Sequence, residues 1–217
     1  MKEKNIQRSL FTDNEKRDLF FFEKKNRERG YQLIAGIDEA GRGPLAGPVV
    51  ASAVILPIDV EIDGLTDSKK VSPSKRDFLF DEIREKALAI GTAIVDNDKI
   101  DSINILQATL LAMKKAVEEL SPLPHYLLID GISPINTNIP LETIKKGDSL
   151  SYSIAAASII AKVTRDRLMV EYDRKYPQYG FSSHKGYGAK SHMEAIIKHG
   201  PSPIHRKSFS GVKEYVK

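Results

Sequence analysis

Two adjacent carboxylates between two apolar runs limit the fold of this chain more than any other feature of its sequence. Residues 33–37 and 49–56 are apolar, contain β-branched side chains and each predict a buried strand, and Asp38 and Glu39 follow the first run directly. A carboxylate at the mouth of an apolar sheet loses hydration unless a cation or strong hydrogen-bond donors compensate. The segment therefore predicts two strands joined by a tight turn, with a charged site beside the turn.

The turn itself is rich in glycine. Gly41, Gly43 and Ala46 match the dinucleotide-binding spacing G-x-G-x-x-[GA], but that motif must open a helix. Here two prolines interrupt the segment and a second strand follows, which argues against a dinucleotide site. We expect Gly41 and Gly43 to adopt positive φ and to let a ligand backbone approach, with Arg42 between them as a donor fork for phosphate.

Composition narrows the possible classes of protein. At 217 residues the chain can bury a full core as one domain, and with no cysteine it can form neither disulfides nor thiolate metal sites. The net charge of +4 and a pI near 9.0 permit nucleic acid as a partner without requiring it. No run is apolar over the length of a signal peptide or membrane span, which predicts a soluble, cytoplasmic protein.

The remaining periodicity predicts helices that alternate with strands. We expect helices over residues 13–29, 73–88, 101–120, 150–176 and 189–198, and strands over 90–95, 125–129 and 141–146. The first helix is expected to pack Leu19 and Phe22 on the core. Together with the two strands around the acidic pair, this order indicates an α/β protein.

Two further carboxylates end strand-like segments. Asp130 follows the strand over 125–129, where it could also be a simple turn residue, and Asp148 precedes the long helix, which it could also cap. If neighbouring strands end together, Asp38, Glu39, Asp130 and Asp148 converge, and such a cluster of charges is tolerable only with divalent cations. Oxygen ligands select Mg²⁺ or Mn²⁺, which near bound phosphate indicates two-metal phosphodiester hydrolysis.

One geometric difficulty concerns the acidic pair. Successive side chains of a regular strand point to opposite faces, so Asp38 and Glu39 cannot share one ion unless the strand ends or bulges there. The alternative, which we favour, is that Glu39 contributes its backbone carbonyl to one ion while its carboxylate serves a second ion.

Basic and aromatic residues in loops are candidates for substrate contact. Lys69 and Lys70 lie in a polar turn and could be ordinary solvated residues or phosphate contacts. Tyr187 stands between two glycines in a basic stretch and could stack on a sugar or base, or be a plain surface residue. The four histidines of the last stretch are interpreted as facing solvent and phosphate, and residues 205–209 as a basic tail. No zinc-binding spacing occurs.

The motifs taken together resemble bacterial ribonuclease HII. The stretches, in family order, are GIDEAGRGPLAGP at 36–48, LIDG at 128–131, KGD at 146–148, SIAAASIIAKVTRD at 153–166, HKGYG at 184–188 and HRKSF at 205–209. Ribonuclease HIII is similar in fold but lacks the Gly-Arg-Gly turn, which favours HII. The resemblance implies a ribonuclease H-like mixed sheet with flanking helices and a small C-terminal helical extension.

The same resemblance implies roles for particular residues. The catalytic, metal-binding set would be Asp38, Glu39, Asp130 and Asp148, holding Mn²⁺ or Mg²⁺. Residues Gly41, Arg42, Gly43 and Tyr187 would recognise the junction of a ribonucleotide with DNA through its 2′-hydroxyl, and Lys69 and Lys70 would lie near the substrate backbone. The implied substrates are RNA/DNA hybrids and DNA duplexes with embedded ribonucleotides, cut on the 5′ side to leave a 5′-phosphate and a 3′-hydroxyl, in replication and repair.

We divide the chain into an N-terminal helix (1–30), a catalytic domain (31–183) and a basic helical extension of that domain (184–217), and expect a monomer. A non-catalytic nucleic-acid-binding module would explain the basic residues but has no use for carboxylates at strand ends, which repel phosphate. A phosphate-binding NTPase would explain the glycines, yet no G-x-x-x-x-G-K-[ST] motif occurs.

Overall fold

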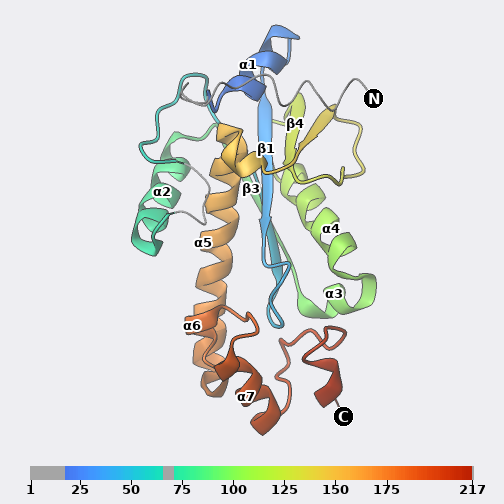
Figure 1. Ribbon diagram of the computed structural model, residues 1–217. Coiled ribbons are helices and arrows are strands. Elements are labelled where there is room, and N and C mark those ends of the chain that lie inside the picture. The colour runs from blue at the N-terminus through green and yellow to red at the C-terminus, as the bar shows by residue number, and fades with distance from the viewer. Residues whose placement is uncertain (1–17, 66–70, 217) are drawn as a thin grey trace, which may run out of the picture.

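The computed structural model describes residues 18–65 and 71–216 and has a five-stranded sheet at its centre (Figure 1). The strand order is β3-β2-β1-β4-β5. The strands are β1 (Ile34–Ala40), β2 (Val49–Ile55), β3 (Ala89–Val95), β4 (Tyr126–Asp130) and β5 (Leu141–Ile144). Strands β1, β2 and β3 pair antiparallel, whereas β1, β4 and β5 pair parallel. The sheet is therefore mixed, as the family resemblance implied, and β1 is its middle strand.

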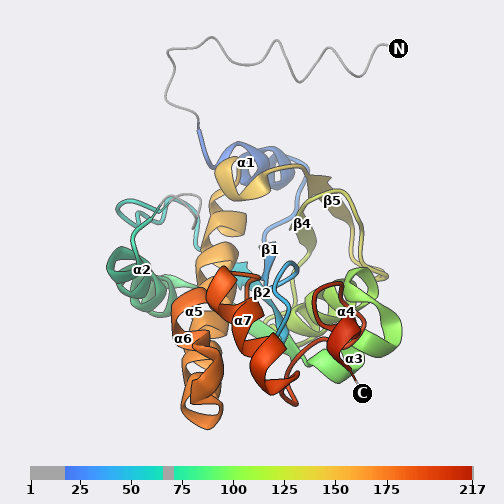
Figure 2. The same cartoon turned by 60° about the horizontal axis from the view of Figure 1, so that its bottom comes forward.

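Helices cover both faces of this sheet (Figures 1 and 2). On one face lies α4 (Ile105–Glu118), preceded by the short α3 (Asn97–Ile103), and its alanines and Met113 pack on Ala35 and Ile37 of β1. On the other face lies the long α5 (Tyr152–Lys175), with α2 (Pro73–Lys86) packed beside it. Because successive side chains of β1 point to opposite faces of the sheet, this strand contributes to a separate hydrophobic core on each face.

Two glycines let the helices approach the sheet very closely. A Cβ atom on Gly36 of β1 would lie 2.1 Å from the carbonyl carbon of Ser153 in α5. A Cβ atom on Gly91 of β3 would lie 2.0 Å from the carbonyl oxygen of Ala116 in α4. Neither helix backbone could keep its present position against a larger residue. Gly36 therefore determines how near α5 lies to the strand that carries the acidic pair.

The N-terminal helix is shorter than expected. Helix α1 spans Phe21–Glu28, whereas the expected helix covered 13–29; residues 13–17 lie outside the described residues. Leu19 packs with the α2–α5 core and Phe22 with the β1–β4 side of the sheet. Glu23 accepts hydrogen bonds from Ser151 Oγ (2.7 Å) and the Ser153 amide (3.0 Å), which attaches α1 to the start of α5.

The bounds of the helix expected over 101–120 are wrong, because the helix is interrupted at Asn104, between α3 and α4. This residue has φ of 66°, a conformation that few non-glycine residues adopt, and its side chain accepts a hydrogen bond from the Gln107 amide at 3.1 Å. The bond caps α4 and separates it from α3. Periodicity alone did not reveal the break, since apolar residues continue on both sides of it.

The C-terminal region folds back under the β1–β2 turn. It contains α6 (Phe181–His184), α7 (Lys190–His199) and short 3₁₀ turns at Pro177–Tyr179 and Lys213–Tyr215. A further 3₁₀ turn, Gly147–Ser149, precedes α5. Ala46 in the turn forms an antiparallel bridge with His205. Figure 2 shows α7 and the chain end near this turn. Among the described helices, none is both long enough and apolar enough to cross a membrane.

Candidate active site

Asp38 near the end of β1 and Asp130 at the end of β4 lie on neighbouring parallel strands and on the same face of the sheet. Ile37 pairs with Ile129 in the β1–β4 ladder, so the two aspartates that follow are next to each other. Ile37 and Ile129 both contribute to the core beneath α4. Because side chains alternate, Asp38 and Asp130 project toward the opposite face, which α5 covers.

Asp148 lies in the 3₁₀ turn before α5, and this turn is attached to Asp130. The amide of Gly147 donates a hydrogen bond of 2.6 Å to Oδ1 of Asp130, which places the next residue, Asp148, beside the end of β4. Asp148 is buried, and Ser151 caps α5 by accepting a bond from the Ile154 amide. The alternative that Asp148 is the cap of this helix is therefore wrong.

The electrostatics of Asp38 differ from those of a surface carboxyl. Its side chain is 5% exposed. Burial, together with the negative charges of Glu39 and Asp130, holds the pKa of Asp38 well above its usual range, although a hydrogen bond with Ser158 of α5 opposes this effect. A cation near Asp38 would offset both effects by stabilising the charged carboxylate. The site thus suits a divalent ion with oxygen ligands.

Glu39 lies on the other face of the strand. The β1–β2 ladder pairs Asp38 with Ser52 and Glu39 with Ala51 without interruption, so the strand neither ends nor bulges at the acidic pair. Oε1 of Glu39 is 3.5 Å from a terminal nitrogen of Arg42. Across residues 18–65 and 71–216, no three Asp, Glu or His side chains form a ready-made metal-ligand set. The carboxylates are thus neighbours whose side chains must adjust to share an ion.

The glycine turn brings Arg42 close to Tyr187. Gly41 has φ of 100°, as expected, but Gly43 does not have positive φ, so the expectation for Gly43 is wrong. Instead, a Cβ atom on Gly43 would lie 3.6 Å from the Tyr187 ring. The side chains of Arg42 and Tyr187 are both about half exposed. The turn and the tyrosine therefore border one surface. Lys69 and Lys70 lie outside the described residues.

Several polar residues of the C-terminal region are buried, contrary to the sequence interpretation. His192, His205 and Arg206 are 0% exposed, so the interpretation is wrong for these two histidines and for the first two residues of the proposed basic tail. His199, Lys207 and Ser208 are exposed, as that interpretation expects. Arg165 of α5 is also buried, and its neighbour Asp166 pairs with Lys162 at 2.8 Å. A sequence signal that could have suggested this burial is the position of Arg165, His205 and Arg206 inside the family motifs; His192 lies outside them and carries no such signal.

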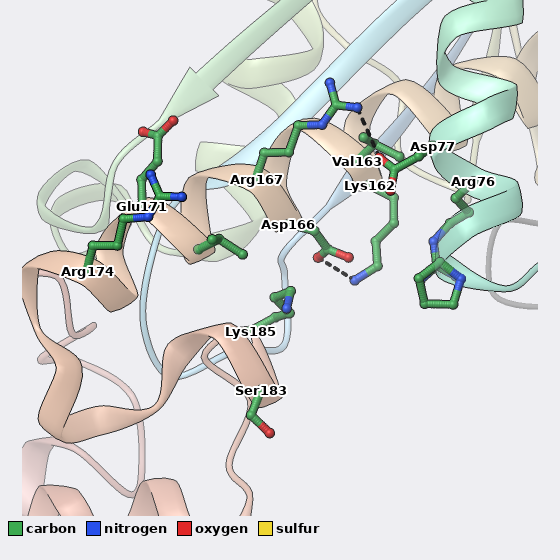
Figure 3. A pocket seen from close by; sticks show the side chains of 12 residues that line it. Arg76, Asp77, Lys162, Val163, Asp166, Arg167, Glu171, Arg174, Ser183 and Lys185 are labelled. Atoms are coloured by element: carbon green, nitrogen blue, oxygen red, sulfur yellow. Dashed lines mark hydrogen bonds and ion pairs between the residues drawn. The ribbon is translucent and has the colours of Figure 1, made fainter.

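A groove of about 620 Å³ lies between α2 and α5 (Figure 3). Its lining includes Lys162, Asp166, Arg167 and Lys185, but none of the four candidate carboxylates. Figure 3 shows Lys162 pointing to Asp166 and Arg167 to Asp77, and these pairs measure 2.8 and 3.0 Å. Because none of the four carboxylates lines it, the groove is separate from the candidate active site.

Comparison with known proteins agrees with this geometry. Residues 35–212 match the family model described as Ribonuclease HII. The ribonuclease HII of Geobacter sulfurreducens is 61% identical over 208 residues, which are 96% of this chain and 96% of that protein. The chain belongs to the ribonuclease HII family. Its members are metal-dependent endoribonucleases, so this chain hydrolyses RNA in RNA/DNA hybrids and acts at ribonucleotides embedded in DNA. The alternative of a non-catalytic binding module is wrong.

Two solved structures show the same fold. Ribonuclease H2 from Pyrococcus horikoshii is 26% identical, with a TM-score of 0.71 over 84% of this chain and 96% of that chain. Bst-RNase HIII in complex with Mn²⁺ is 21% identical, with a TM-score of 0.65 over 84% of this chain and 68% of that chain. The mixed sheet with flanking helices is therefore the ribonuclease H-like fold that the motifs implied.

Proposed function

We propose that Asp38, Glu39, Asp130 and Asp148 are the catalytic, metal-binding residues of this ribonuclease HII. The observation that carries the proposal is the buried Asp38, whose charge is opposed by burial and by Glu39 and Asp130 at once. A carboxyl in such surroundings suits a divalent cation, because the cation compensates the charge that the sheet cannot. Asp130 is held in place by the Gly147 amide, and Asp148 by the turn that follows that amide.

The nature of the donors supports Mg²⁺ or Mn²⁺. All four candidate ligands are carboxylates, and oxygen ligands favour these ions over zinc or copper. The structural relative Bst-RNase HIII has been solved in complex with Mn²⁺. When bound, such ions lower the pKa of an attacking water and stabilise the leaving oxygen. Because Glu39 lies on the opposite face of β1 from Asp38, we propose that its carbonyl serves one ion and its carboxylate another.

Substrate recognition is assigned to the surface that borders these carboxylates. We propose that Gly41, Arg42 and Gly43 bind the backbone at the junction of ribonucleotide and DNA, and that Tyr187 stacks on the sugar and reads its 2′-hydroxyl. Support comes from the close approach of Gly43 to the Tyr187 ring and from the half-exposed Arg42.

The remaining parts of the proposal concern the reaction and its setting. Lys69 and Lys70 are proposed to bind the phosphate backbone. Cleavage on the 5′ side of the ribonucleotide would leave a 5′-phosphate and a 3′-hydroxyl. We place the enzyme, as a monomer, in the cytoplasm, where DNA replication and repair produce such substrates.

The test uses a labelled DNA duplex with one ribonucleotide, incubated with Mg²⁺, Mn²⁺ or chelator. Wild type should cut on the 5′ side of the ribonucleotide with either ion, and chelator should abolish cutting. Asp38→Asn should lower the rate at least about 100-fold, since even partners of metal ligands cost 10- to 100-fold when mutated. Asp166→Asn is the matched control, because it removes a carboxylate of α5 that pairs with Lys162 outside the site.

Two results would overturn the assignment. Asp38→Asn could cut at the wild-type rate, in which case Asp38 holds no essential ion. Alternatively, Asp166→Asn could lose as much activity as Asp38→Asn, which would show that the assay reports general damage to α5. Circular dichroism of both variants should match that of wild type.

A further inference from the structure

A fully buried arginine holds the substrate-binding turn from beneath. Arg206 donates hydrogen bonds to the carbonyl oxygens of Gly41 (2.5 Å), Arg42 (2.9 Å), Pro44 (2.7 Å) and Gly47 (3.0 Å). Its guanidinium forms no ion pair with any carboxylate in the described part of the chain. The hydrogen bonds of its guanidinium therefore all hold the backbone of the turn between β1 and β2.

A second buried arginine supports the same turn from α5. Arg165 donates to the carbonyl oxygens of Pro48 (3.0 Å) and Ala46 (3.1 Å), and also to that of Lys185 (3.0 Å) in the loop that carries Tyr187. Placing two guanidinium groups in the interior is costly, and it is tolerable here because backbone carbonyls satisfy their N–H donors. Two buried arginines therefore donate hydrogen bonds to the backbone of a single turn.

The residue before Arg206 supports Tyr187 through a chain of imidazoles. The amide of Ser202 donates to Nδ1 of His205 at 2.8 Å, so Nδ1 is an acceptor and the proton of His205 is on Nε2. That Nε2 is 3.0 Å from Nε2 of His192, which must accept. The other ring nitrogen of His192 then donates to the carbonyl oxygen of Tyr187 at 2.8 Å. Each proton position follows from the one before it.

We propose that His205 and Arg206 are positioning residues that join the two halves of the substrate-binding surface and thereby set its preference for a ribonucleotide–DNA junction. Arg206 fixes the turn that carries Arg42, and His205 fixes the carbonyl of Tyr187 through His192. Neither residue touches substrate. The inference rests on the proposed role of Arg42 and Tyr187 in reading the junction.

The test compares two substrates of one sequence: a DNA duplex with a single ribonucleotide and a uniform RNA/DNA hybrid. The measured quantity is the ratio of kcat/KM for the first substrate to kcat/KM for the second. Arg206→Lys keeps the charge but offers three donors in place of a five-donor fork, so the turn loses part of its support. We expect the ratio to fall about tenfold, which corresponds to about 1.4 kcal/mol.

Matched variants separate positioning from general stability. Leu79→Ala removes a buried side chain of α2. This change should lower Tm and leave the ratio of the two kcat/KM values unchanged. Arg42→Ala should itself lower the ratio, and adding Arg206→Lys to it should produce no further fall, because both act through one turn. If Arg206→Lys fails to fold, Arg165→Lys tests the same claim from the other side of the turn.

The outcomes are distinct. A wild-type ratio in Arg206→Lys, with a lowered ratio in Arg42→Ala, would overturn the inference and leave the proposed function intact. Full additivity of the two changes would also overturn it, since Arg206 would then act elsewhere. A wild-type ratio in Arg42→Ala would overturn the role of the turn in reading the junction, and the inference with it.

Discussion

Replacing Gly36 by alanine should displace α5 from the sheet and disable the active site. The added Cβ would lie 2.1 Å from the carbonyl carbon of Ser153, whereas ordinary contact begins near 3.4 Å, so α5 and β1 must separate by more than an ångström. The obstacle is helix backbone, which has no rotamer to change. Overpacking a core costs 1–3 kcal/mol, and we expect about 3 kcal/mol here, or a fall in Tm of about 6–12 °C.

The same displacement should affect catalysis, because Asp38 lies two residues along the strand and is hydrogen-bonded to Ser158 of α5. The assay measures Tm and urea unfolding first, then cleavage of the ribonucleotide-containing duplex at a temperature where the variant is folded. Activity per folded molecule should fall at least about tenfold, as expected when catalytic groups move by about 1 Å.

Gly91→Ala is the matched control for this experiment. Its Cβ would lie 2.0 Å from the carbonyl oxygen of Ala116, an equally severe clash, but with α4, which carries no proposed site residue. The two variants should lose similar stability, and only Gly36→Ala should lose activity per folded molecule. A Gly36→Ala enzyme with wild-type Tm, or with full activity once folded, would refute the reasoning.

Two further predictions concern stability. Burial lowers the pKa of both His192 and His205 to about 4, so the folded state stays unprotonated where the unfolded state binds protons. The contribution of these two histidines to the free energy of unfolding should therefore be fully present above pH 6.5. It should fall toward pH 4 by up to about 1.4 kcal/mol per pH unit for each imidazole. Urea unfolding of Asp38→Asn checks this, because the raised pKa of Asp38 in wild type would change stability with pH in the opposite direction. Equal urea midpoints of this variant at pH 7 and pH 5 would contradict the prediction. Separately, Asn104→Ala should cost about 2 kcal/mol through backbone strain and the lost cap, and Asn104→Gly less than half of that, as measured by thermal unfolding; equal losses would show that the φ of 66° carries no strain.

The sequence predicted the central strands well, because two charged side chains between apolar runs are compatible with few folds. The apolar runs on either side of Asp38 and Glu39 form β1 and β2, and the strand before Asp130 is the parallel neighbour of β1. The division of α3 from α4 was missed, because it depends on one side-chain cap at Asn104 and not on periodicity.

The sequence predicted the buried polar residues poorly. Histidine and arginine near a chain end usually indicate a solvated surface, but Arg206 donates hydrogen bonds to carbonyl oxygens more than 150 residues away, and His192 is hydrogen-bonded to the Tyr187 carbonyl and to His205. Such partners can be recognised only after the chain is folded. The same holds for the contact of Gly43 with Tyr187, which joins positions far apart in the sequence; neither that contact nor the φ of Gly43 requires a glycine there.

The hydrogen bonds from Arg206 to the glycine turn also constrain the order in which the enzyme can be built during translation. Arg206 and Gly41 are 165 positions apart in the chain. The strands, the long helix and all four carboxylates are synthesised before the residue that completes the turn. A nascent chain therefore gains the carboxylates of its proposed active site before it gains the arginine that shapes its recognition surface. Synthesis of the segment around Arg206, and not formation of the sheet, would then mark the point at which the nuclease can become selective.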